Sequence, residues 1–164
     1  MLAPRVLLAA VLIGIPVAAD AQDITALIQA GRFEEAAAAA PSDQRDEVAR
    51  AIFQRAYQFG HQIQDFAYAS RGYAAAKRLV TMGDPMYEQL SFWHGFALYS
   101  SAVDAQAAQT VASAQAALPM FEGALDLFAE AGAYPTSVNV NMVQLVDATN
   151  TYIAIQQAVI RRGR

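Results

Sequence analysis

The stretch DPMYEQLSFWHGFALYSSAV, residues 84–103, decides the fold. Aspartate caps helix N-termini well and proline suits the first helical turn, so Asp84 and Pro85 predict the start of a helix. Apolar residues then recur at helical spacing along two stripes, which hold Met86, Leu90, Trp93 and Ala97 on one and Phe92, Phe96, Tyr99 and Val103 on the other. Two stripes indicate packed neighbours on two sides. We predict that this helix is the centre of an all-α domain.

The chain upstream of residue 84 has the same helical period. Residues 23–30 predict a short helix, Gly31-Arg32 a turn, and residues 33–40 a second helix that Pro41 ends. Ser42 or Asp43 is expected to cap the next helix. Its apolar stripe comprises Val48, Ile52, Ala56, Phe59 and Ile63. The pattern shifts phase at residues 69–72, and residues 73–82 predict a further helix.

The chain downstream of residue 103 needs a turn within residues 104–113, because one helix over 85–132 would be about 70 Å long. No glycine or proline marks that turn. The following helix ends at Gly132, and Pro119 is expected in its first turn or at a kink. Thr136 or Ser137 is expected to cap a last helix that runs to about Arg162. Alternation at Val138, Val140 and Met142 leaves a short strand as the alternative.

The N-terminus resembles a secretory signal peptide. Arg5 precedes an uncharged apolar run over residues 6–19, and Ala19 and Ala21 form a small-x-small cleavage site. The run is shorter than the roughly 20 residues that cross a bilayer, and the alternative is an uncleaved anchor. We expect cleavage after Ala21, which leaves residues 22–164 as one periplasmic or secreted domain with no stable membrane insertion. The chain has no cysteine, so it forms no disulfide and carries no lipid at cysteine.

Composition and motifs argue against catalysis and against nucleic acid as a partner. The net charge of −4 lacks the basic excess that phosphate backbones require. His61 and His94 stand alone, without a metal-ligand motif beside them, so we expect neither a metal nor any other cofactor. No serine lies in a nucleophile elbow, and no glycine-rich loop is present. An enzyme that uses Asp84 or Glu88 beside His94 remains a minor alternative.

One short segment, GRFEEA at residues 31–36, has a recognisable inter-helix pattern. Gly31 allows a tight turn, Phe33 fills the space between two helices and Ala36 permits their close approach. The segment resembles the turn of a tetratricopeptide (TPR) repeat, with echoes at residues 71–76 and 117–125. The candidate alanines Ala36, Ala76 and Ala117 are spaced by 40 and 41 residues, against 34 in a standard repeat. The full pattern of a TPR first helix is missing.

The resemblance implies irregular antiparallel helical hairpins in a right-handed superhelix with a C-terminal capping helix. It also implies a concave groove that binds a peptide or protein segment without catalysis. The expected function is that of an exported adaptor or accessory subunit for another envelope protein. Tyr57, Trp93 and Tyr99 are the candidate partner-binding residues, although Trp93 and Tyr99 equally suit the core. The sequence leaves homo-oligomerisation through a leftover apolar face open.

A second hypothesis makes the protein a carrier for a small apolar ligand. Four phenylalanines at helical spacing could line an enclosed pocket in a helical bundle, namely Phe92, Phe96, Phe121 and Phe128. A pocket of roughly 300 Å³ or more would favour this hypothesis over the adaptor.

Overall fold

A computed structural model describes residues 23–134 and 141–163, and within these ranges helices are the only regular secondary structure. The α-helices are α1 (Ile24–Gln29), α2 (Phe33–Ala39), α3 (Arg45–Gln62), α4 (Phe66–Lys77), α5 (Pro85–Ala105), α6 (Val111–Ala131) and α7 (Met142–Arg162), and one 3-10 turn, η1 (Gln106–Ala108), follows α5. The predicted all-α class is confirmed. Within these residues no helix is both long and apolar enough to cross a membrane. The predicted leader, residues 1–21, lies outside the described residues.

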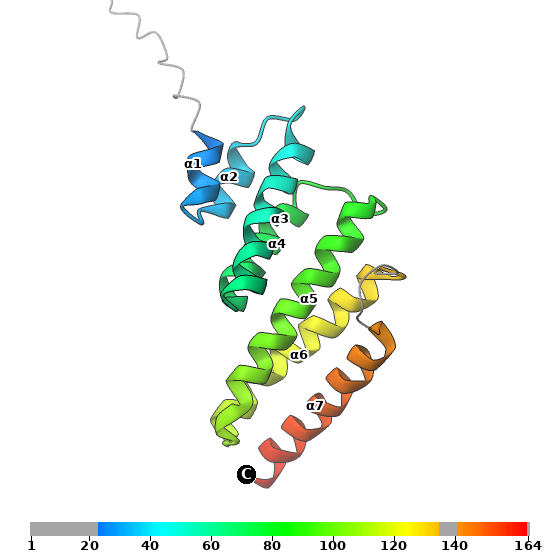
Figure 1. The fold of residues 1–164 in the computed structure, drawn as a ribbon. Helices are drawn as coiled ribbons and strands as arrows, with labels where there is room; N and C mark the ends of the chain where they lie inside the picture. Colours follow the sequence, from blue (N-terminus) through cyan, green and yellow to red (C-terminus); the bar gives the residue numbers. More distant parts are fainter. Residues whose placement is uncertain (1–22, 135–140, 164) are drawn as a thin grey trace, which may run out of the picture.

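The helices form antiparallel pairs that follow one another along the molecule (Figure 1). The main contacts join α3 to α4, α4 to α5, α5 to α6 and α6 to α7, and the short helices α1 and α2 pack beside α3 and α4. In Figure 1, α1 and α7 lie at opposite ends of the described molecule. Each long helix therefore packs on its neighbours in sequence, and α5 is central, as residues 84–103 predict.

Predicted helix boundaries are confirmed at Gly132 after α6 and at Arg162 in α7, and also near the start of the chain and of α5. The carboxylate of Asp84 accepts a hydrogen bond from the backbone N–H of Met86 at 2.7 Å, with Pro85 as the first residue of α5. Asp23 caps α1 by accepting from the N–H of Ala26 at 3.2 Å. Gly31 has a φ of +74°, a conformation that favours glycine. At Asp84, Asp23 and Gly31 the residue type itself favours a helix start or a turn, and packing against other helices does not override that preference.

Other boundaries upstream of α5 differ from the predictions. The residue before α3 is Gln44, whose side chain makes no cap, so neither Ser42 nor Asp43 caps that helix. The helix predicted over residues 73–82 begins at Phe66, where Asp65 accepts from the N–H of Tyr68, and it ends at Lys77. The chain turns at Gln64, which has a φ of +56° and carries none of the usual turn signals.

Downstream of α5, the predicted turn within 104–113 is present as η1. It ends at Gln109 in the left-handed conformation, and Thr110 then caps α6 in a capping box with Ser113. Pro119 lies inside α6, beyond its first turn. Asn141 caps α7, and the predicted caps Thr136 and Ser137, like Val138 and Val140, lie outside the described residues. Met142 starts α7, so the strand alternative fails there.

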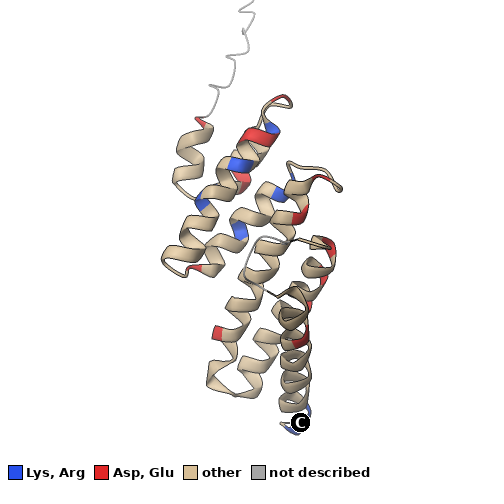
Figure 2. Ribbon diagram, turned by 45° about the vertical axis from the view of Figure 1, so that its right-hand side comes forward, with Lys and Arg blue, Asp and Glu red and all other residues tan. Residues whose placement is uncertain are grey.

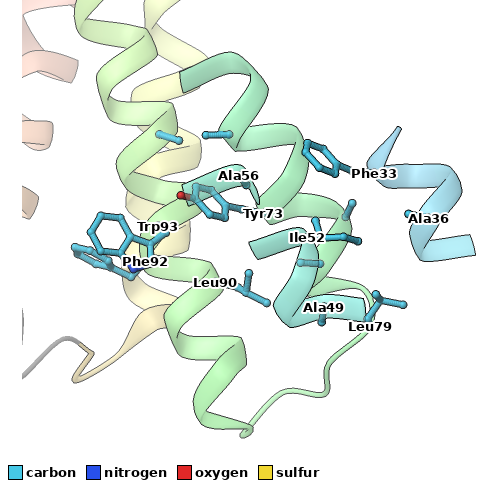
Figure 3. Packing of buried hydrophobic residues seen from close by; sticks show 14 of the residues in the cluster. Phe33, Ala36, Ala49, Ile52, Ala56, Tyr73, Leu79, Leu90, Phe92 and Trp93 are labelled. Atoms are coloured by element: carbon cyan, nitrogen blue, oxygen red, sulfur yellow. The ribbon is translucent and has the colours of Figure 1, made fainter. Parts of the chain in front are cut away.

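The core of the first helices combines large aromatic and aliphatic side chains with alanines (Figure 3). Phe33, only 2 % exposed, reaches from α2 towards Gly72 of α4. A methyl group at Gly72 would lie 2.6 Å from Cβ of Ala56 on α3. The echo at residues 71–76 is therefore a close helix contact inside α4, and not a turn.

The helices α2, α4 and α6 each bury an aromatic residue followed three positions later by alanine. The pairs are Phe33 with Ala36, Tyr73 with Ala76, and Phe121 with Ala124. The alanine that matches in α6 is thus Ala124, whereas the predicted Ala117 lies one turn before Phe121 and is equally buried. An alanine one turn from a large ring lets a neighbouring helix approach closely.

Candidate functional site

A groove of about 790 Å³ lies between α3 and the start of α5. It forms because α3 packs mainly on α4 and contacts α5 at few points. Its walls mix charged, amide and apolar side chains, which are Arg50, Phe53 and Gln54 from α3, Asp84, Pro85, Met86, Glu88 and Gln89 at α5, and Tyr134. We call this the α3–α5 groove. Its volume lies within the range of ligand-binding clefts.

Charges of opposite sign lie on the two walls of the α3–α5 groove. Arg50 lies on the α3 wall, whereas Asp84 and Glu88 lie at the first turn of α5. In Figure 2, charged positions of both signs occur on the N-terminal helices, and the half of the molecule with the α5–α6 turn carries few. The groove therefore lies in the more charged half of the described molecule.

The structure brings together two of the three sequence-predicted binding residues, Tyr57 and Trp93. Their rings meet edge to face with centroids 5.0 Å apart. Tyr57 is 38 % exposed, whereas Trp93 is 5 % exposed and belongs to the core. Phe53, Tyr57 and His61 follow one another at four-residue spacing on α3, with ring centroids 5.7 and 4.1 Å apart. They form an aromatic ridge that continues from the groove, and Trp93 supports it from beneath.

Tyr99, the third predicted residue, lies elsewhere. Its ring contacts those of Phe121 at 5.8 Å and Tyr152 at 6.0 Å, between α5, α6 and α7. Partial burial, together with Tyr152, raises the pKa of Tyr99. Among the described residues, the ring of Tyr99 therefore pairs with rings of α6 and α7 and with none of the aromatic ridge.

The four phenylalanines of the carrier hypothesis pack against other side chains and do not line a ligand pocket. Phe92 and Phe128 belong to the main core, whereas Phe121 belongs to a second, smaller cluster. Next to Phe96 the described residues enclose a cavity of only about 10 Å³. That volume falls far below the roughly 300 Å³ of a ligand pocket.

A polar cluster joins α4, α5 and α6, and the sequence analysis missed it. One carboxylate oxygen of Glu130 accepts hydrogen bonds from Nζ of Lys77, from the hydroxyl of Tyr87 at 3.3 Å and from Oγ of Ser91 at 3.2 Å. Partial burial raises the pKa of Glu130, but the bond and charge of Lys77 outweigh it, so the net shift is downward. A hollow of about 310 Å³ lies beside Lys77, Tyr87 and His94.

His94 is the most perturbed titratable group in this region. Burial, reinforced by Lys77 and opposed by Glu130, lowers the pKa of His94 to about 4, so its imidazole is neutral at neutral pH. Its Nδ1 is buried with no hydrogen-bond partner among the described residues. Tyr87, Ser91 and His94 share one face of α5 at spacings of four and three. The polar residues at this helical spacing are the feature of the sequence from which the cluster could have been predicted.

The sequence leaves open an enzyme that uses Asp84 or Glu88 beside His94, and it predicts no metal site at His61 or His94. In the described part of the chain, His94 forms no hydrogen bond with Asp84 or Glu88, whose positions flank the α3–α5 groove. Over the same residues, no three His, Cys, Asp or Glu side chains are placed to hold a metal ion. The ring of His61 packs at a tilt against that of Tyr57 and meets that of Trp93 edge to face, and partial burial lowers the pKa of His61.

Comparison with known proteins supplies no family. No protein-family model, no curated protein and no solved structure matches the chain. A function for this protein therefore has to be inferred from its own residues.

Proposed function

We propose that this protein is a non-catalytic, exported helical adaptor that holds a peptide segment of an envelope protein in the α3–α5 groove. The observation that carries the proposal is the groove itself, about 790 Å³ in volume and lined by apolar, amide and charged side chains. Peptide sites need this mixture, because apolar side chains anchor the segment and polar groups pair with its backbone and charges.

The arrangement of helices supports a hairpin adaptor related in design to TPR proteins. Buried aromatic–alanine pairs recur on α2, α4 and α6, which are the second helices of the pairs. The groove is lined by the first helices α3 and α5. In TPR-like proteins the resemblance likewise assigns binding to the first helices, and the two features together favour that architecture.

The groove predicts the chemistry of its partner. Phe53, Met86 and Tyr134 offer an apolar floor for one large side chain of the peptide. Asp84 and Glu88 favour a basic residue on the α5 side, because opposite charges attract and fix the direction of binding. The adaptor should therefore bind an extended segment in which an apolar anchor stands beside Lys or Arg.

Tyr57 extends the peptide-binding surface beyond the α3–α5 groove, and Trp93 supports the Tyr57 ring from within the core. Tyrosines at a partly wet rim bury a large ring while the hydroxyl stays hydrated, which makes them frequent binding hot spots. Trp93 holds the Tyr57 ring by the edge-to-face contact at 5.0 Å. Truncation of Tyr57 should weaken binding with the fold intact, whereas truncation of Trp93 should unfold the core.

Site-specific photo-crosslinking tests the adaptor function. A photoreactive residue is placed at Gln54 or Gln89 in the groove, and at the exposed Gln115 on α6 as the matched control. In the native envelope, both groove positions should capture the same protein through one short segment with an apolar anchor and a basic residue. The control position should not capture it.

Two results would contradict the adaptor. One is equal capture from Gln115, which would show collision rather than binding. The other is an adduct that the charge reversal Glu88→Lys leaves unchanged, because a basic segment should then be repelled.

Export is a separate part of the proposal, carried by the leader pattern over residues 1–21. The chain isolated from cells should have the mass of residues 22–164, beginning at Gln22, and should fractionate with the periplasm or the medium. A chain that keeps residues 1–21 and sediments with membranes would show an uncleaved anchor instead.

A further inference from the structure

A second hollow, of about 570 Å³, lies where η1 faces the C-terminal half of α7. One wall is a single face of α7, on which Tyr152, Ile155, Gln156 and Val159 recur at spacings of three, one and three. The other wall is the end of α5 with η1. The α3–α5 groove lies at the opposite end of α5, about 30 Å away at 1.5 Å per residue. We call this hollow the η1–α7 pocket, and it is independent of the proposed adaptor groove.

Three glutamines supply the polar groups of the η1–α7 pocket. Gln106 and Gln109 come from the α5–α6 turn, and Gln156 comes from α7. Gln156 is only 4 % exposed, and its Nε2 donates a hydrogen bond to Oε1 of Gln106. An amide carries two donors and an acceptor, so this bond leaves both side chains with further hydrogen-bonding capacity.

The backbone at Gln109 is unusual. Its φ of +50° and ψ of 32° place it in the left-handed region, which side chains with a Cβ rarely adopt. Glycine would suit this position better, and backbone strain of this kind concentrates at functional sites. The strained turn keeps an amide side chain on the pocket wall.

Apart from the glutamines, the side chains that line both walls are apolar. The ring of Tyr152 lies parallel to that of Phe121, with centroids 5.1 Å apart and planes at 4°. Val103, Ala107 and Val159 add aliphatic surface. A flat ring beside amides suits a ligand that has an apolar face and a hydroxylated edge.

The charge of the pocket restricts the ligand further. None of the described residues that line it is charged. A charged ligand would lose hydration there without gaining an ion pair. A hydroxyl group, which both donates and accepts, can pair with both ends of an amide.

From these features, we propose that the η1–α7 pocket binds an uncharged saccharide unit. The amides of Gln106, Gln109 and Gln156 take its hydroxyl groups, and Tyr152 takes the C–H face of its ring. This would be a second binding site, independent of the peptide groove.

Calorimetric titration tests the proposal with glucose, N-acetylglucosamine, maltose and cellobiose as neutral probes. Glucuronate and glucosamine serve as charged counterparts of similar size. At least one neutral sugar should bind saturably, and the charged counterparts should bind at least about tenfold more weakly.

Variants locate the site. Gln109→Gly removes one amide and relieves the strained backbone, so the fold should stay intact while sugar affinity falls about tenfold. Gln156→Met should have the same effect, and the exposed Gln157→Ala on α7 is the matched control. The proposal is overturned if no neutral sugar binds, if glucuronate binds equally well, or if Gln109→Gly retains full affinity. It is also overturned if the chain is a dimer whose second copy closes the pocket.

Discussion

The contact among α2, α3 and α4 and the contact of α7 with its neighbours differ in the side chains that they bury. At the first, Gly72 and Ala56 are so close that an added methyl group would lie 2.6 Å from its neighbour, and Phe33 closes the gap. At the second, the buried residues of α7 are the polar Thr149 and Gln156, and a hollow of about 570 Å³ remains beside Gln156.

This difference indicates that the first contact mainly stabilises the fold, whereas the second leaves room for a ligand. Close packing of apolar groups contributes most of the free energy of unfolding, and it leaves no room for a ligand. Long polar side chains pack less efficiently and keep free donors and acceptors. We therefore expect substitutions in the first helices to change stability most, and substitutions near α7 to change it least.

The largest effect is expected for Phe33→Ala. The variant removes a ring that is 2 % exposed between α2, α3 and α4, and it should lower the free energy of unfolding by about 3–5 kcal/mol. Urea denaturation measures the loss. The control is Met82→Ala, at a side chain that is 80 % exposed. A loss no larger than that of the control would contradict the close-packed contact.

The next effect is a dependence of stability on pH through His94. Its pKa is near the ordinary value of 6.5 in the unfolded chain and about 4 in the folded protein. The unfolded state therefore binds the extra proton between these values, and stability falls as the pH drops from 6.5 to 4, by about 3 kcal/mol.

The two histidines of the chain provide the control for that measurement. His94→Gln should remove most of the loss between pH 6.5 and 4, whereas His61→Gln should keep most of it, because His61 is the more exposed of the two although partial burial lowers its pKa as well. An equal pH dependence in the wild type and in His94→Gln would show that His94 titrates normally.

A smaller effect is expected for Glu130→Gln, which weakens the bonds from Lys77, Tyr87 and Ser91. The Lys77 side chain is mostly buried but Glu130 is partly exposed, so we expect a loss of about 1–2 kcal/mol at pH 7. Because the folded pKa of Glu130 is lowered, its contribution is present above its ordinary pKa and disappears as the pH falls through the folded value. Thermal unfolding at low and at neutral pH measures both the loss of stability and its dependence on pH. An unchanged unfolding temperature at neutral pH would show that the cluster does not stabilise the contacts among α4, α5 and α6.

The smallest change, of opposite sign, is expected for Gln109→Gly. Glycine adopts the observed φ of +50° without strain, so the variant should gain about 0.5–1 kcal/mol. Chemical denaturation should show this gain while the sugar titration shows the loss of affinity. A destabilised variant would mean that the Gln109 side chain supports the fold and that its strain has a structural origin.

The parts of the fold that the sequence predicted depend on local signals. Asp84-Pro85 and Gly31 act within a few residues of themselves, and both lie where the pattern places them. Gln64 and Gln109 turn the chain with positive φ angles, although neither is a residue type that favours them. The two turns therefore had no signal of their own, whereas the residues that follow them, Asp65 and Thr110, are types that cap helices and mark the starts of α4 and α6.

The candidate sites depend on residues that are far apart in sequence. Lys77 and Glu130 are separated by 53 residues, and Gln106 and Gln156 by 50. Single-sequence periodicity carries no information about such pairs. It did single out Tyr57 and Trp93 as candidate binding residues, but it did not establish that the ring of Tyr57 is exposed and that of Trp93 is buried.

The adaptor account is tested most directly by hydrogen–deuterium exchange with a synthetic peptide of the segment that crosslinks to Gln54. The account predicts slower exchange in α3 and the first turns of α5, with α7 unchanged. Protection of α7 with no change in α3 would contradict it, because the peptide would then bind at the loosely packed end and the α3–α5 groove would have no part in recognition.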